Sequence, residues 1–221
     1  MRRILRENGL SILLGLFFLS SIFGQIFFGH QESNEDRQQH GLPPLGFVAY
    51  LGSSHFVEVT MENWESEFLQ MGVYVFLTAF LYQKGSAESK SLSEPEPVDR
   101  DPRRFKNKMH APWPVRRGGF VLKLYENSLS LAFLLLFLIA FLLHAAGGRG
   151  QYNQEQLVHG QPAVTFLGYL ATSRFWFESF QNWQSEFLAI GCMVVFSIFL
   201  RQRGSPESKP VDSPHFQTGT E

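Results

Sequence analysis

Two long runs of apolar residues constrain this 221-residue chain more than any other feature. Residues 10–28 contain no ionisable side chain, and residues 129–146 contain only His144, close to one end. About 20 apolar residues in a helix cross a hydrocarbon core roughly 30 Å thick, and each Leu, Ile or Phe favours insertion by about 0.3–0.6 kcal/mol. The sequence therefore predicts an all-α integral membrane protein.

Composition and motifs narrow the functional classes. Lys and Arg number 19 against 20 Asp and Glu, which argues against charge-driven binding of nucleic acid, and a single cysteine excludes a disulfide scaffold. The sequence has no Walker-type loop, dinucleotide fingerprint, Cys-x-x-Cys pair, His-Glu-x-x-His or Gly-x-Ser-x-Gly motif. We therefore expect no enzyme activity, no cofactor and no bound metal.

The chain contains an internal duplication. Residues 7–90 align without a gap on residues 126–209, an offset of 119 positions, and about 33 of roughly 84 pairs are identical. Two residues related by this offset are called counterparts below. Because each copy contains two apolar segments, the sequence predicts two parallel two-span copies related by an axis along the membrane normal.

Four spans and four regions follow from the duplication. The predicted spans are about 10–28, 61–82, 128–146 and 180–200. The predicted regions are a first repeat at 1–90, a Pro-rich and charged linker at 91–119, a second repeat at 120–209, and a disordered tail at 210–221. About 16 of the 19 Lys and Arg lie in the two ends and the central linker. The positive-inside rule therefore places both termini and the linker in the cytoplasm, with the chain as a multi-pass protein of the cell membrane.

Several residues are expected to begin or end these helices. Ser53 or Ser54, and Thr172 or Ser173, are candidate N-caps of the second and fourth spans. Gly85 and Gly204 are expected to be left-handed C-caps at the other ends of those spans. Glu7-Asn8 and Glu126-Asn127 are expected to begin the first and third spans.

The linker is rich in Pro, Ser and Glu in its first part, where we expect disorder, and basic in its second part. Its cations could contact anionic lipid, at about 1 kcal/mol for each cation near the surface, or could serve only to set the topology. These cations are Arg103, Arg104, Lys106, Lys108, Arg116 and Arg117. The partners expected for the chain are thus the bilayer, anionic lipid and a second copy of itself, and no nucleic acid.

The outer connections, about 30–54 and 149–173, each contain His-Gly-x-Pro and a set of aromatic and apolar residues at helical spacing. The spacing predicts a short helix lying on the membrane surface in each connection. Trp64, Trp176 and Trp183 are expected to be interface anchors in the outer aromatic belt.

Two glutamates stand out because they occur in both copies and fall within or next to predicted spans. Glu67 and Glu186 follow Asn63 and Asn182 by four positions, so each pair shares a helix face. Carboxylates at such depth are expensive and are functional candidates by default. Three interpretations remain open. The first is a proton or cation site, and the second is a two-His, two-carboxylate metal site with His40 and His159. The third is a structural role in which each Glu accepts hydrogen bonds from the ends of a re-entering loop, each His caps a turn before Gly, and the Trp residues anchor the helices at their depth.

The segments Glu62–Gln70, Gly85–Lys90 and Ala111–Arg117, with their second-copy versions, resemble an uncharacterised bacterial membrane-protein family described as a domain of unknown function. The resemblance covers nearly the whole chain, and its most specific motif is the repeated Asn-Trp-x-Ser-Glu-Phe-Leu. It implies a bacterial cytoplasmic-membrane protein and no activity. We expect a non-enzymatic scaffold or partner-binding envelope protein, or alternatively a small proton or cation transporter or channel component that uses Glu67 and Glu186.

Overall fold

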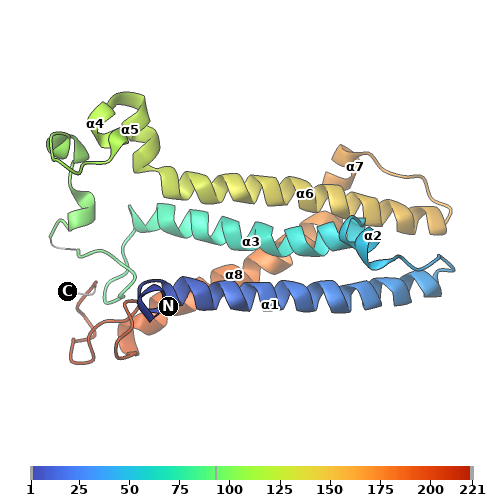
Figure 1. The fold of residues 1–221 in the computed structure, drawn as a ribbon, viewed down its shortest axis with the longest axis horizontal. Helices are drawn as coiled ribbons and strands as arrows, with labels where there is room; N and C mark the ends of the chain where they lie inside the picture. Colours follow the sequence, from blue (N-terminus) through green and yellow to red (C-terminus); the bar gives the residue numbers. More distant parts are fainter. Residues whose placement is uncertain (1, 93, 220–221) are drawn as a thin grey trace. The chain divides into compact units, whose positions relative to one another are not determined.

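The computed structural model describes residues 2–92 and 94–219, and all regular secondary structure in these residues is helical. The helices are shown in Figure 1. Their bounds are α1 Arg2–Gln39, α2 Phe47–Leu51, α3 Ser54–Thr78, η1 Pro97–Asp99, η2 Pro102–Phe105, α4 Trp113–Arg117, α5 Gly119–Glu126, α6 Ser128–Val158, α7 Phe166–Leu170 and α8 Ser173–Phe199.

Three helices, α1, α6 and α8, are long and apolar enough to cross a membrane. Helix α3 is 25 residues long but is not among them, and it carries four glutamates at positions 58, 62, 65 and 67. The short helices expected in the outer connections are present as α2 and α7.

The chain divides into two compact units, each described by itself. Unit 1 contains Met1–Met61 and Leu142–Phe175, and unit 2 contains Glu62–Phe141 and Trp176–Glu221. In unit 1 the Ser53 hydroxyl accepts a hydrogen bond from the backbone N–H of Phe56 (3.2 Å), and the Thr172 hydroxyl accepts one from that of Phe175 (3.4 Å). These bonds confirm Ser53 and Thr172 as the caps of α3 and α8.

The expectation that Glu7-Asn8 and Glu126-Asn127 begin the first and third spans is wrong in one respect, because a helical segment precedes each Asn. Asn8 interrupts α1 with non-helical dihedrals (φ −130°, ψ 15°), and Asn127 closes α5 with similar ones (φ −113°, ψ 9°). Each side-chain amide donates to the carbonyl four residues back, Ile4 at 3.3 Å and Lys123 at 2.9 Å. The two asparagines therefore kink the chain where a preceding segment meets a membrane helix.

Gly85 and Gly204 have the positive φ that was expected (87° and 85°), but neither is a helix C-cap. Helices α3 and α8 end earlier, at Thr78 and Phe199. Each glycine lies instead in a turn of the exit loop that follows its helix. The same loop is built twice: the Ser89 hydroxyl accepts from the N–H of Gln83 (3.0 Å), as the Ser208 hydroxyl does from that of Gln202 (2.9 Å).

The two exit loops differ in their lysines. Lys209 is buried, and its ammonium donates to the carbonyl oxygens of Gly85 (2.5 Å), Gln217 (2.8 Å), His215 (3.1 Å) and Pro214 (3.3 Å). Burial, and then the charge of Arg201, lower the pKa of Lys209. Its counterpart Lys90 instead pairs with the carboxylate of Asp99 at 2.6 Å.

The tail, for which the sequence predicts disorder, has a described path up to residue 219. The Gly219 N–H donates to the carbonyl of Ser86 (2.9 Å), and the Gly85 N–H donates to the hydroxyl of Thr218 (2.9 Å). Together with the carbonyl oxygens around Lys209, these bonds attach residues 214–219 to the first exit loop.

Within unit 2, η2, α4 and α5 pack on one another next to the start of α6 (Figure 1). Their small core consists of Ala111, Val115 and Leu122. Further along, Gly72 of α3 lies so close to α6 that an added Cβ would meet side-chain atoms of Leu134 and Phe133 at 3.2–3.3 Å. The counterpart Gly191 has open space around it, so the two glycines play different packing roles.

Candidate functional site

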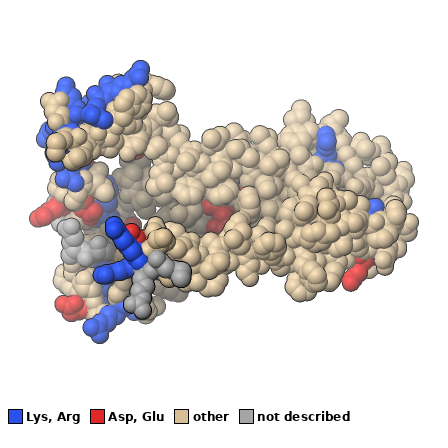
Figure 2. Space-filling view, in the orientation of Figure 1, with Lys and Arg blue, Asp and Glu red and all other residues tan. Residues whose placement is uncertain are grey.

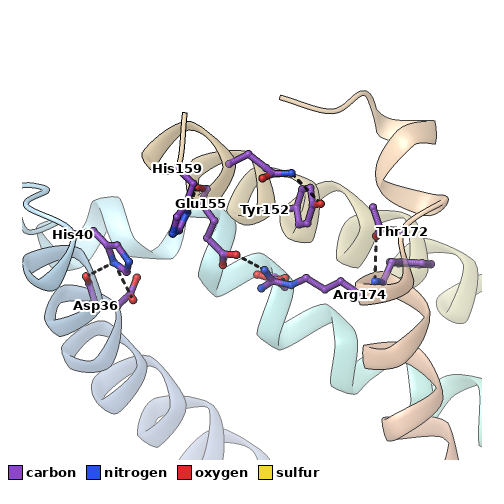
Figure 3. A network of polar contacts seen from close by, with 10 residues as sticks. Asp36, His40, Tyr152, Glu155, His159, Thr172 and Arg174 are labelled. Atoms are coloured by element: carbon purple, nitrogen blue, oxygen red, sulfur yellow. Dashed lines mark hydrogen bonds and ion pairs between the residues drawn. The ribbon is translucent and has the colours of Figure 1, made fainter. Parts of the chain in front are cut away.

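His40 and His159 end α1 and α6. Each Nδ1 lies against the carbonyl oxygen four residues back, Asp36 at 2.9 Å and Glu155 at 2.7 Å, and Figure 3 shows each ring folded onto its own helix end. The following glycines, Gly41 and Gly160, have φ near +70°. The repeated His-Gly pair is therefore a helix C-cap, as the structural reading expected.

Each outer connection is held by one asparagine. Asn34 donates its amide to the carbonyl of Leu45 (3.0 Å) and accepts from the N–H of the same residue (2.7 Å). Its counterpart Asn153 does the same to Val164, at 3.1 and 2.8 Å. Two bonds to one residue fix both its N–H and its C=O, so each Asn pins its connection to the helix that precedes it.

Each short helix then buries one tyrosine against a glycine. Tyr50 of α2 and Tyr169 of α7 have no exposed surface. A Cβ added at Gly29 would lie 2.3 Å from the Tyr50 hydroxyl, and one at Gly148 would lie 2.2 Å from the Tyr169 hydroxyl. Only glycine leaves this space. Burial, and then the charge of Glu32, raise the pKa of Tyr50.

An ionic network in unit 1 was not anticipated from the sequence. Arg174, at the start of α8, places one guanidinium nitrogen 2.5 Å from the carboxylate of Glu155 (Figure 3). The other lies 3.9 Å from the carboxylate of buried Glu58. A carboxylate in an apolar helix is stable when a cation compensates it. The network therefore explains how α3 can carry Glu58.

A second set of contacts, in unit 2, also went unrecognised. The side-chain amide of Asn182 donates to the carboxylate of Glu62, and the indole N–H of Trp183 donates to that of fully buried Glu65 at 2.9 Å. The sequence did contain a signal. Positions 58, 62 and 65 have the spacing i, i+4 and i+7, which puts three acids on one face of an apolar helix and indicates a polar partner there.

Trp183 is therefore engaged in the protein through its N–H, rather than only anchoring at an interface. Its ring centroid lies 5.3 Å from that of Phe180 and 6.5 Å from that of Trp176. Trp64 instead packs edge-on against Phe68 at 6.3 Å. The prediction that these tryptophans lie at headgroup depth remains a prediction.

Glu67 on α3 and Glu186 on α8, the two candidate carboxylates, are both in unit 2. Neither carboxylate accepts a hydrogen bond or forms an ion pair within residues 2–92 and 94–219. Glu67 and Asn63 are exposed on α3, whereas Glu186 and Asn182 are half-buried on α8. Around the axis of α3, position 67 faces about 180° away from positions 58 and 65, whose glutamates have partners.

The two histidines and the two carboxylates belong to different units of the structure. His40 and His159 belong to unit 1 and Glu67 and Glu186 to unit 2. Among the described residues, no three His, Cys, Asp or Glu side chains form a group that could hold a metal ion. The candidate site therefore consists of the two carboxylates alone.

Comparison with known proteins agrees with the resemblance found in the sequence. No curated protein matches the chain. No solved structure matches it either. One family does match, over residues 1–220, and its description is a domain of unknown function (DUF6766). With its whole length covered and three helices suited to crossing a membrane, this chain belongs to the DUF6766 family.

Proposed function

We propose that the chain is a non-enzymatic, four-span protein of a bacterial cytoplasmic membrane, built from two parallel two-span copies. The bounds of the helices support the duplication. Helix α7 begins 119 residues after α2 (166 minus 47), and α8 begins 119 residues after α3 (173 minus 54). The distribution of Lys and Arg supports cytoplasmic termini.

In this proposal α3 is the second span, despite its four glutamates. Three of them receive compensation from α8: Glu58 from Arg174 in unit 1, and Glu62 and Glu65 from Asn182 and Trp183 in unit 2. A charge that is hydrogen-bonded or ion-paired costs much less in the bilayer than an exposed one. The remaining glutamate, Glu67, has no such donor among the described residues.

The function that the geometry supports best is binding and transfer of a proton or a monovalent cation by Glu67 and Glu186. The observation that carries it is that Glu67 and Glu186 lie on helices that are in contact, since the Gln70 amide of α3 donates to the backbone carbonyl of Glu186 at 2.8 Å, and that neither carboxylate has a partner among the described residues. A half-buried carboxylate without a donor, such as Glu186, is stabilised by a bound proton or cation. Four spans are few for a transporter, so the functional form is proposed to be a homo-oligomer in which another copy covers the exposed Glu67 face.

The test is ion flux through vesicles that contain the purified full-length chain and a pH-sensitive dye, under an imposed membrane potential. Replacing both carboxylates in Glu67→Gln/Glu186→Gln is expected to reduce proton flux at least about tenfold, because the amides cannot ionise. The matched control is Glu7→Gln/Glu126→Gln, which makes the same change at another counterpart pair, and it should leave flux unchanged. Circular dichroism of each variant in detergent would verify that the helices are intact.

Absence of flux in the parent protein above that of protein-free vesicles would overturn the proposal. So would a folded Glu67→Gln/Glu186→Gln variant that conducts as well as the parent. If sodium or potassium flux disappears in that variant while proton flux never occurs, the transferred ion is the metal cation.

A second candidate is a scaffold that binds a partner through its outer connections. The observation that favours it is a pair of exposed counterparts, Val48 on α2 (82% exposed) and Leu167 on α7 (76% exposed). The helices that display them are pinned by Asn34 and Asn153. A photo-crosslinking residue at either position should give the same protein adduct in growing cells, whereas one at Leu10 should give lipid adducts only. Lipid adducts alone at all three positions would exclude this role.

A further inference from the structure

The segment formed by η2, α4 and α5 carries a concentration of positive charge. Residues 102–117 contain six Lys and Arg and no Asp or Glu. Figure 2 shows the basic side chains gathered over η2 and α4. Residues 128–148, the first part of α6, contain no Lys, Arg, Asp or Glu. Two cations lie on aromatic rings: the Lys108 ammonium is 4.5 Å from the ring centroid of half-buried Phe105, and the Arg117 guanidinium is 5.3 Å from that of exposed Trp113.

The same segment contains an apolar cavity of about 430 Å³. Its lining is mostly apolar, and Lys108 is the one Lys or Arg in it. The residues that line it are Pro102, Phe105, Lys108, Met109, His110, Ala111, Pro112 and Val115. Cavities of this size hold small-molecule ligands in many proteins. An apolar cavity lined by one cation, Lys108, on a segment that carries five more suits a ligand that combines an anionic head with a hydrocarbon chain.

The connection of this segment to α6 places it at a membrane surface. Helix α5 ends at Glu126, Asn127 kinks the chain, and α6, one of the three membrane-suited helices, begins at the next residue. Phe120 at the start of α5 is 80% exposed and Met109 is 84% exposed. Large apolar side chains beside cations are typical of segments that lie in the headgroup region of a bilayer.

We infer that the η2–α4–α5 segment is a binding site for an anionic phospholipid, whose phosphate lies among Arg116, Arg117 and Lys108 and whose acyl chain enters the cavity beside Met109. The cations select an anionic headgroup, since Lys and Arg near a leaflet attract acidic lipid over zwitterionic lipid. The apolar cavity accommodates the acyl chain. A nucleic acid would need the cations but not the cavity, and it would not be held at the start of a membrane helix.

The test is native mass spectrometry of the full-length chain in detergent with equal amounts of phosphatidylglycerol and phosphatidylcholine of the same acyl chains. The parent is expected to retain the anionic lipid about tenfold over the zwitterionic one. Arg116→Gln/Arg117→Gln should bring that ratio close to one. The control Lys84→Gln/Arg203→Gln neutralises two exposed counterpart cations in the exit loops and should keep the ratio of the parent.

A second variant tests the cavity without changing its buried wall. Met109→Glu introduces an acid at an exposed position of the rim and should reduce retention of phosphatidylglycerol at least about fivefold. Equal retention of both lipids by the parent, or an unchanged ratio in Arg116→Gln/Arg117→Gln, would overturn the inference. Displacement of the lipid by millimolar inorganic phosphate, or by a single-stranded RNA oligonucleotide, would also overturn it, because the site would then recognise phosphate alone.

Discussion

Helices α3 and α8 occupy counterpart positions in the sequence, yet they have diverged in complementary ways. Where α3 has Glu58, Glu62 and Glu65, the counterparts in α8 are Phe177, Gln181 and Gln184. In turn, α8 supplies the donors that meet these acids, Arg174 in unit 1 and Asn182 and Trp183 in unit 2. As a result, α8 is apolar enough to cross a membrane by composition and α3 is not.

Under the proposed duplication, this difference gives two copies in one chain contacts that two identical copies could not make. If both helices carried the acids, carboxylates would face carboxylates across a twofold contact, and like charges at close range repel. When one helix carries the acids and the other carries the donors, the hydrogen bonds and ion pairs form only if these two helices pack against each other. Glu67 and Glu186 are the exception, since the same residue was kept in both helices.

The largest expected effect comes from breaking the most buried of these contacts. Trp183→Phe keeps an aromatic ring but removes the donor to Glu65, which has no exposed surface. A buried carboxylate that loses a donor should lower the free energy of unfolding by about 2–4 kcal/mol. The counterpart variant Trp64→Phe should cost less than about 1 kcal/mol, because the Trp64 ring contact with Phe68 persists.

Unfolding of both variants in a detergent micelle titrated with dodecyl sulfate, followed by circular dichroism, would measure these changes. Equal losses for Trp183→Phe and Trp64→Phe would mean that the two helices do not have the complementary roles described here.

The exit loops provide the next comparison. Lys209→Met removes the ammonium that four carbonyl oxygens share, and it should destabilise the attachment of residues 214–219 by about 1–3 kcal/mol. Lys90→Met breaks only the pair with Asp99 and should cost about 0–1 kcal/mol. Limited proteolysis of the tail is the measurement. A tail equally resistant in Lys209→Met and in the parent would contradict this account.

The smallest expected effect concerns pH. Burial and then the charge of Glu207 raise the pKa of Glu88 above its ordinary 4.5, although a hydrogen bond from Tyr74 opposes the shift. The folded loop thus holds its proton more tightly than the unfolded loop. Its stability is greatest below pH 4.5 and decreases as the pH rises through the folded pKa.

Hydrogen exchange of residues 83–90, followed from pH 4 upward and corrected for the intrinsic rate, should therefore show decreasing protection. Glu88→Gln should remove the dependence, and Glu207→Gln should weaken it. A Glu88→Gln loop with the pH dependence of the parent would show that another group is responsible.

Local patterns predicted much of the fold. Apolar length indicated α1 and α6, and helical spacing after His-Gly-x-Pro indicated α2 and α7. Ser53 and Thr172 were each one of two candidate caps. The ends of α3 and α8 were placed too late, because Gly85 and Gly204 have the φ of a C-cap but use it in a turn beyond the helix. A glycine in the sequence indicates that a positive φ is possible at that position. It does not indicate whether the residue ends a helix or lies in a later turn.

The candidate site was recognised only in part, since the search favoured residues that the two copies share. Repetition drew attention to Glu67 and Glu186, and to two histidines that prove to be helix caps. It drew attention away from Glu58, Glu62 and Glu65, which are replaced by other residues in the second copy and have their partners on α8. An acid with a donor on another helix cannot be told from an unpaired one until the packing of the helices is known.

The sequence by itself determined that this chain is helical and has segments suited to crossing a membrane, because apolar length and periodicity are properties of the linear order. Only the tertiary structure decided which carboxylates have donors on another helix and which lysine is buried. Those outcomes depend on contacts between residues more than 100 positions apart, such as Glu65 with Trp183, and no local pattern specifies which distant side chain will arrive.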